Sequence, residues 1–153
     1  MKLEFLGHSC FLIQSEKRIL IDPFISGNPA ASRTKEDLKD IDMVLVTHGH
    51  GDHLGDAFEI AKANNATLVA MYEIANYSKK KGVLKAEPMN IGGTIVVDGI
   101  EITMTNATHS SDFEGGVGHA SGFIIRLPDH TVYHAGDTGV FYDMKLISEI
   151  YRP

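Results

Sequence analysis

The 153-residue sequence contains one cysteine, no tryptophan and fewer basic than acidic residues. The single thiol, Cys10, cannot form a disulfide within the chain, and no basic region leads into an apolar stretch at the start, so we expect a reducing, cytoplasmic location. No apolar run approaches the length that spans a membrane. With 14 basic against 20 acidic residues the net charge is -6, which disfavours nucleic acid and anionic membranes as partners.

The rest of the composition is that of a globular domain, with 43% hydrophobic and 22% charged residues. The length favours a single domain over residues 1–153, because two independent domains of ordinary size would barely fit. A fragment of a larger protein is the alternative. One feature is unusual: the chain has eight histidines, and three of them fall within the six residues 48–53.

Apolar patterning in the first half predicts an alternation of strands and helices. The expected strands cover residues 2–6, 11–14, 19–21, 43–46 and 67–70, and the expected helices cover residues 56–64 and 73–81. A segment rich in turn formers, 24–33, is expected to form a surface loop. Thr34 and Asp37 resemble the capping pair of a short helix.

The second half predicts a further ladder of strands. An Asp98-Gly99 turn joins the segments 94–97 and 100–105 in a hairpin. A flexible glycine-rich loop at 115–118, strands at 122–127 and 131–134, and an amphipathic helix at 141–150 complete the pattern. This mixture predicts a layered α/β or α+β fold in which helices cover sheets.

Metal-binding chemistry is concentrated in residues 47–53, T-H-G-H-G-D-H, at the end of the predicted buried strand. Because side chains two residues apart in an extended chain point the same way, His48 and His50 can bind one ion. Asp52 and His53 need a tight turn to point elsewhere, which the neighbouring glycines permit. The alternative is a polar loop in which Asp52 caps the next helix and the histidines are merely exposed.

Two later residues can extend such a site. His109 follows the strand 100–105 and can complete a three-histidine site with His48 and His50. Asp137 follows the strand 131–134, where its carboxylate could bridge two cations about 3.5 to 4 Å apart. Each has a plainer interpretation, because His109 could be a loop residue at a strand end and Asp137 could cap the following helix.

Taken together, these motifs resemble the metallo-β-lactamase superfamily, whose T-H-x-H-x-D-H hallmark is matched in full by residues 47–53. His109 and the Gly-Asp-Thr at 136–138 resemble the next two metal motifs, in the right order. The stretches G-H-S-C-F at 7–11 and I-D-P-F-I-S-G-N-P at 21–29 resemble more narrowly a family of uncharacterised metal-dependent hydrolases, similar to L-ascorbate-6-phosphate lactonase. The resemblance implies a four-layer αββα sandwich.

The resemblance also implies the ligands of two metal ions. Those of the first ion are three histidines, His48, His50 and His109. Those of the second ion are Asp52 and His53, and the bridging carboxylate is Asp137. The superfamily supplies one more histidine to the second ion from its C-terminal part, and residues 1–153 contain no match for it. The resemblance therefore implies one domain that is incomplete at its C-terminus, so that either the rest exists as another chain or residues 1–153 are a fragment. We predict a companion chain that supplies this histidine, and we also expect a homo-oligomer.

His8 and Asp22 are candidates for roles around the metal ions. His8 lies in a turn between two predicted strands, and is either an exposed turn residue or a catalytic residue that orients substrate, donates a proton or hydrogen-bonds a metal-bound water. The resemblance favours the second interpretation. Asp22 can support a ligand histidine or simply form an Asp-Pro turn. The other three histidines are not assigned as ligands: His119, His130 and His134.

A two-metal site would lower the pKa of a bound water to roughly 7. The predicted function is therefore a hydrolase whose metal-bound hydroxide cleaves an ester, lactone or phosphodiester-type bond in a small molecule, with Asp52 accepting a hydrogen bond from the hydroxide. Zinc is the first choice, but manganese, nickel and iron also suit imidazole with carboxylate. The alternatives are a phosphodiesterase or nuclease of the same superfamily, a non-hydrolytic di-iron or other metal-binding module, and an inactive fragment.

Overall fold

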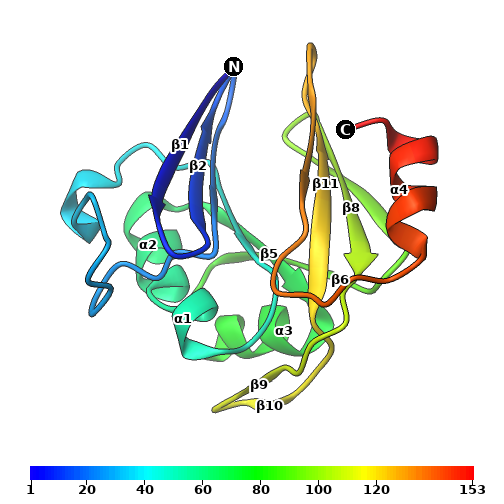
Figure 1. Ribbon diagram of the computed structural model, residues 1–153. Coiled ribbons are helices and arrows are strands. Elements are labelled where there is room, and N and C mark those ends of the chain that lie inside the picture. The colour runs from blue at the N-terminus through cyan, green and yellow to red at the C-terminus, as the bar shows by residue number, and fades with distance from the viewer.

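The computed structural model describes residues 1–153, which form two facing β-sheets with helices outside them (Figure 1). The first sheet has six strands in the spatial order of the sequence. They are β1 (Lys2–Gly7), β2 (Cys10–Gln14), β3 (Arg18–Ile21), β4 (Met43–Val46), β5 (Thr67–Met71) and β6 (Lys85–Met89). The first three pair antiparallel, and β3 to β6 pair parallel.

The second sheet is antiparallel and has four strands in the order β12-β11-β8-β7. They are β7 (Thr94–Val97), β8 (Ile100–Asn106), β11 (Ser121–Arg126) and β12 (Thr131–His134). Asp98 and Gly99 form the predicted turn between β7 and β8, both with positive φ. A separate two-stranded ribbon consists of β9 (Asp112–Phe113) and β10 (Gly116–Val117).

The helices complete the layers. Helices α2 (Ala57–Asn64) and α3 (Tyr72–Lys80) pack on the first sheet, and α4 (Asp143–Tyr151) lies beside the second sheet on the opposite side of the molecule (Figure 1). The other two helices are short, η1 (Lys35–Asp37) and α1 (Gly51–Leu54). The order helix, sheet, sheet, helix confirms the predicted αββα architecture. None of these helices combines the length and apolar character needed to cross a bilayer.

A single cluster of 34 buried residues fills the interior. It includes Leu45 and Val69 from the first sheet and Ile102 and Phe123 from the second, all fully buried. Every residue of β4 is buried. This agrees with its uninterrupted apolar sequence, because parallel strands in layered folds are covered on both faces.

Two local features differ from the sequence-based expectations. Strand β6 was not predicted, because Pro88 and two charged residues obscure its pattern, yet Ala86 and Met89 are buried while Lys85 and Glu87 are exposed. Its position at the sheet edge tolerates proline, which lacks an N–H for the strand ladder. The expected flexible loop at 115–118 is in part strand β10, which pairs with β9.

Strand directions bring three connections of the first sheet to one edge. Because β2 is antiparallel to β3 and β3 is parallel to β4, the β1–β2 turn lies at the same edge as the ends of β3 and β4. The register confirms this arrangement, since Phe11 at the start of β2 pairs with Ile21, which in turn pairs with Leu45. The turn residue His8, the buried Asp22 and the histidine motif are thereby placed together.

The second sheet presents its own loops to this edge. Asn106 at the end of β8 pairs with Ser121 at the start of β11, and His134 at the end of β12 pairs with Phe123. Ser121 joins the two sheets, because its N–H and its hydroxyl both donate to the carbonyl of Thr47, at 3.1 and 2.7 Å. The segments that follow β8 and β12 therefore lie beside the histidine motif.

Candidate metal centre

The histidine motif passes directly from β4 into the single turn of helix α1. The carbonyl of His50 accepts hydrogen bonds from the N–H groups of His53 at 3.0 Å and Leu54 at 2.8 Å. Gly55 ends the turn with a φ of 39°, and a Cβ there would lie 2.6 Å from the carbonyl oxygen of Pro23. The tight turn expected from the sequence is thus one turn of helix, which separates Asp52 and His53 from the two preceding histidines.

Three histidines form the first cluster. Nε2 of His48 lies 3.0 Å from Nδ1 of His50, and the ring of His109 lies 5.1 and 5.2 Å from those two rings. One nitrogen from each of the three lies within 4.8 Å of the others. His109 arrives from the second sheet, in the loop after β8. The structure therefore brings together the three residues that the sequence predicts for a first metal ion.

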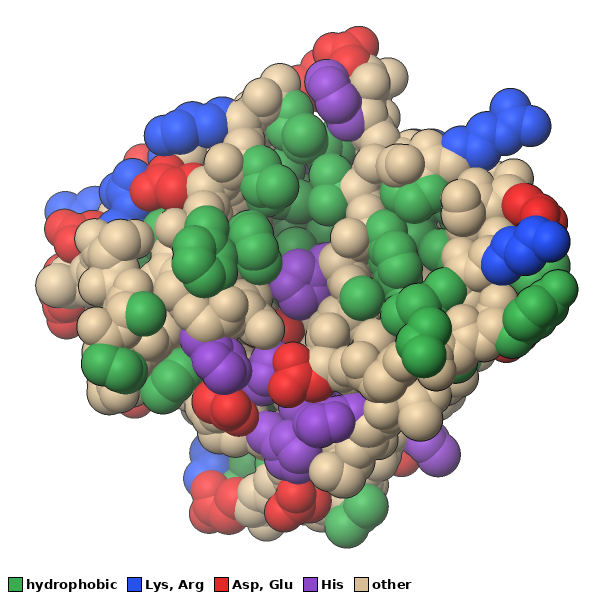
Figure 2. Space-filling view, viewed as in Figure 1, with side chains coloured by type: hydrophobic (Ala, Val, Ile, Leu, Met, Phe, Trp, Pro, Cys, Tyr) green, Lys and Arg blue, Asp and Glu red, His purple; other side chains and the backbone are tan.

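A second cluster includes His53. It contains ligand atoms of His8, Asp52 and His53 within 4.8 Å of one another, with Nε2 of His8 at 3.2 Å from Oδ2 of Asp52. Figure 2 shows histidine and acidic side chains gathered in the hollow between the two halves of the molecule. His8 was not expected in a ligand cluster, because the sequence places it only in a turn.

Asp137 lies between the two clusters. Its Oδ2 is 3.3 Å from Nε2 of His53 and 3.7 Å from Nε2 of His109. It also groups with His48 and His53 as a possible set of ligands. The preceding residue, Gly136, has a φ of 64°, and a Cβ at this position would lie 2.5 Å from the carbonyl oxygen of Ser121. Glycine is therefore needed where the chain turns toward Asp137. One carboxylate thus lies near histidine nitrogens of both clusters.

Asp22 supports these residues from beneath and is itself fully buried. Its carboxylate accepts hydrogen bonds from the Thr47 N–H at 2.8 Å, the Thr47 hydroxyl at 2.6 Å and Nδ1 of His53 at 2.9 Å. Burial raises the pKa of Asp22, but the hydrogen bonds and the nearby His53 and His134 lower it below its usual value. The predicted contact from Asp22 to a histidine of the motif is therefore present, whereas metal binding by that histidine stays a prediction.

The protonation of Asp22 determines which nitrogens of the neighbouring histidines are free. An ionised carboxylate only accepts, so in the neutral form of His53 the Nδ1 carries the proton and Nε2 keeps its lone pair. This Nε2 is buried and has no hydrogen-bond partner. Burial lowers the pKa of His53, but Asp22 raises it overall, which makes the unpartnered nitrogen more basic.

A similar relay orients His48. The Thr47 hydroxyl donates to Asp22, so it accepts from Nδ1 of His48 at 3.0 Å and leaves a lone pair on Nε2 of that histidine. Burial, together with the nearby charge of His53, lowers the pKa of His48 to about 4. His48 is therefore neutral at neutral pH, which is the form that binds metal.

The donor atoms fit a divalent metal. With Zn–N bonds of about 2.0–2.1 Å in a tetrahedral site, two ligand atoms are separated by about 3.3 Å. The pairs His48–His50, His8–Asp52 and His53–Asp137 are separated by 3.0, 3.2 and 3.3 Å. Together with the unpartnered Nε2 of His53, these separations are those expected when pairs of ligands share an ion.

Ser111 and Asp112 are among the residues after His109 that contact the motif, and neither was singled out from the sequence. The hydroxyl of Ser111 accepts a hydrogen bond from the N–H of Gly49 at 3.1 Å, and Oδ1 of Asp112 lies 3.3 Å from Nε2 of His50. Their only sequence signal is that they follow His109 in the run H-S-S-D. They fix the backbone and the outward ring nitrogen of the first cluster.

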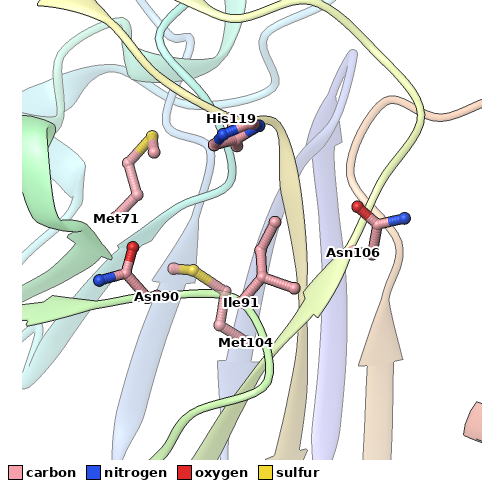
Figure 3. Close-up of a pocket in the computed structure, with 6 residues that line it drawn as sticks. All are labelled: Met71, Asn90, Ile91, Met104, Asn106 and His119. Carbon is pink, nitrogen blue, oxygen red and sulfur yellow. The ribbon is translucent and has the colours of Figure 1, made fainter.

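The three unassigned histidines lie outside these clusters. Nε2 of His134 lies 3.2 Å from the carbonyl oxygen of Ser9, and His130 is exposed in its turn. His119 lines a pocket of about 330 Å³ between the sheets (Figure 3). The other lining residues are Met71, Asn90, Ile91, Met104 and Asn106. No residue of this pocket belongs to a ligand cluster.

Comparisons with known proteins place the chain in a family. Residues 17–153 match the model of the beta-lactamase superfamily domain. The chain is 53% identical over 160 residues to a UPF0173 metal-dependent hydrolase of Methanosarcina barkeri, and 56% identical over 156 residues to one of Pyrococcus abyssi. Each match covers all of this chain and 68% of the relative. The chain therefore belongs to the beta-lactamase superfamily.

A solved structure agrees with this assignment. Igni18, described as a metallo hydrolase from the archaeon Ignicoccus hospitalis, is 39% identical and superposes with a TM-score of 0.85. The match covers 99% of this chain and 66% of Igni18. The chain thus spans about two thirds of the length of these relatives.

Proposed function

We propose that the chain forms the main part of a metal-dependent hydrolase that cleaves an ester, lactone or phosphodiester-type bond in a small molecule. The observation that carries this proposal is the pair of ligand clusters on either side of one carboxylate, with the Nε2 of His53 buried and unpartnered. The names of the relatives support the same class of reaction.

The proposed ligands follow the clusters. The first ion would be held by three histidines, His48, His50 and His109. The second ion would be held by Asp52 and His53, and the bridging carboxylate would be Asp137. This division is supported by the separations within each cluster and by the position of the Asp137 carboxylate between them.

Two divalent cations in such a site lower the pKa of a water and polarise a carbonyl or phosphoryl oxygen of the substrate. The protein's part is to hold and orient the reacting groups. Burial raises the pKa of Asp52, but its own backbone N–H and the neighbouring His53, His8 and His50 lower it below the usual value, so Asp52 is ionised at neutral pH. Its half-exposed carboxylate can accept a hydrogen bond from an attacking water.

A protein nucleophile is not needed for this reaction. Cys10, the only thiol, is fully buried, and burial together with nearby Asp22 and Asp56 raises its pKa to about 12. Its thiolate is therefore absent at neutral pH. The two clusters instead bring together side chains that suit a metal ion. Because these ligands are imidazoles and carboxylates with no thiolate, we propose zinc first, with manganese, nickel or iron as alternatives.

The test combines metal content with turnover. His48→Ala and Asp137→Asn should each reduce bound metal and should lower hydrolysis of esters, lactones or phosphodiesters by at least 100-fold. His130→Ala is the control, because His130 is exposed and lies in none of the clusters. Unchanged turnover in both ligand variants contradicts the proposal, and iron-rich protein without hydrolysis supports a di-iron module instead.

We also propose a companion polypeptide that corresponds to the remaining third of the relatives. The second sheet ends at β12, and a groove of about 290 Å³ lies between this strand and β2, lined by Phe11, Val132 and Tyr133 among others. Native mass spectrometry should detect a complex with a second polypeptide, whereas a monomer contradicts the companion and a complex of identical chains supports the predicted homo-oligomer.

A further inference from the structure

His8 adopts a left-handed backbone conformation that its position in the hairpin requires but that most residues with a side chain disfavour. It is the first of the two residues that connect β1 to β2, and its φ is 57°. Short hairpins normally place glycine or asparagine at such a position, because a side chain crowds the left-handed backbone. A non-glycine residue held there is a reason to look for a function.

The surroundings fix the His8 ring over helix α1. Its ring packs edge-on against Phe24 at 5.8 Å and against His53 at 5.2 Å. Its Nε2 lies 3.2 Å from Oδ2 of Asp52, although the two atoms do not form a hydrogen bond with good geometry. The ring nitrogen is therefore directed at the carboxylate without being satisfied by it.

An independent observation shows where a ligand would lie. His53 is fully buried, its Nδ1 contacts Asp22, and its Nε2 has no hydrogen-bond partner. Ligand atoms of His8, Asp52 and His53 all lie within 4.8 Å of one another. Two imidazole nitrogens and a carboxylate oxygen therefore converge on one point, which is a donor set that binds divalent cations.

We propose that His8 is a ligand of the second metal ion, together with Asp52 and His53. The proposal rests on the proposed metal-dependent function, and it assigns His8 a different role from the proton donor suggested by the sequence. With Asp137 as the bridge, the second ion then has four ligand residues within residues 1–153. Three of them lie in connections of the first sheet, and Asp137 follows a strand of the second sheet. A histidine from a companion chain is not required to hold this ion.

The variant that tests the proposal is His8→Asn. Asparagine tolerates positive φ, so this change removes the imidazole while keeping the hairpin turn. Loading the metal-free protein with 113Cd should give two NMR resonances in the unchanged protein. In His8→Asn one resonance should shift or disappear, and binding of the second cation, followed by calorimetry with Zn²⁺, should weaken by at least 10-fold. His130→Asn is the matched control and should preserve both resonances.

The outcomes separate this proposal from the proposed function. His48→Ala should remove the resonance that His8→Asn leaves in place. If His48→Ala removes metal while His8→Asn leaves both resonances and both affinities unchanged, His8 is not a ligand and only this proposal fails. Reduced turnover in His8→Asn with unchanged metal binding also overturns it and favours the proton donor. If the unchanged protein binds only one cation, the second site as proposed does not exist.

Discussion

Replacing Asp22 by asparagine should weaken metal binding by His53, although His53 itself is unchanged. The Asp22 carboxylate accepts from the N–H and the hydroxyl of Thr47 and from Nδ1 of His53. Asparagine has the same shape but only one acceptor oxygen. If that oxygen stays with the Thr47 N–H, the NH2 group faces Nδ1 of His53. Nδ1 must then accept, and the imidazole proton moves to Nε2, the nitrogen proposed to bind metal.

The magnitude follows from the loss of one outer hydrogen-bond partner. Disrupting such a partner lowers metal affinity by about 10- to 100-fold, or about 1.4 to 2.7 kcal/mol. The metal-free protein should also be less stable, because a hydrogen bond to a charged group contributes about 1.5 to 3 kcal/mol. For a domain of this size, this loss lowers the melting temperature by about 3 to 12 °C.

The control is a chemically identical change at a similar backbone position. Asp98 also has positive φ, 47° against 45° for Asp22, but it is exposed in the β7–β8 turn. Asp98→Asn should leave both metal affinity and melting temperature unchanged, because Asn-Gly suits this turn as well as Asp-Gly does. Calorimetric titration of Zn²⁺ into each metal-free protein measures the affinities. Equal zinc affinity in Asp22→Asn and the unchanged protein would refute the tautomer argument.

Two further predictions concern buried groups outside the proposed ligand set. The thiol of Cys10, whose pKa burial raises to about 12, should resist a thiol reagent at pH 8 in the folded protein and react fully after unfolding; rapid labelling of the folded chain contradicts its burial. Asp56 accepts from the N–H groups of Ile25 and Ser26 at 3.1 and 2.7 Å, and although burial raises its pKa, these bonds lower it overall. Its contribution to stability is present above the unfolded pKa of about 3.9 and is lost as pH falls through the lower folded value. Asp56→Asn should therefore reduce stability to urea at pH 7 and flatten its loss below about pH 4, whereas an unchanged pH profile would show that the carboxylate charge is unimportant.

The sequence was most informative where local pattern and chemistry coincide. The run Met43–Val46 predicts a buried strand without tertiary information, and the histidines that follow it must then lie at a strand end. The resemblance of the later motifs to those of the superfamily selected His109 and Asp137, because the residues alone left plainer interpretations open. Their grouping with the motif residues is observed, whereas their binding of metal stays a prediction.

The sequence was least informative where two distant segments define an environment. His8 and Asp52 are 44 residues apart by their numbering, and they meet only because β2 is antiparallel to β3 while β4 is parallel to it. Nothing local in G-H-S-C-F encodes that pairing. Asp56 is a similar case, because a carboxylate before a helix suggests an N-cap. Its side chain makes no capping hydrogen bond to α2 and instead accepts hydrogen bonds from the N–H groups of Ile25 and Ser26 in the loop after β3.

The position of the clusters also relates metal binding to the packing of the two sheets. Each proposed ion needs ligands from both: His109 joins two histidines of the first sheet at one ion, and Asp137 joins His53 at the other. The sheets also meet at this edge through the hydrogen bonds from Ser121 to Thr47 and through the common core. An ion that binds only the assembled edge stabilises it by about 4 kcal/mol at 1,000 times its dissociation constant. Binding of metal should therefore stabilise the packing of the two sheets against each other as well as complete the proposed site.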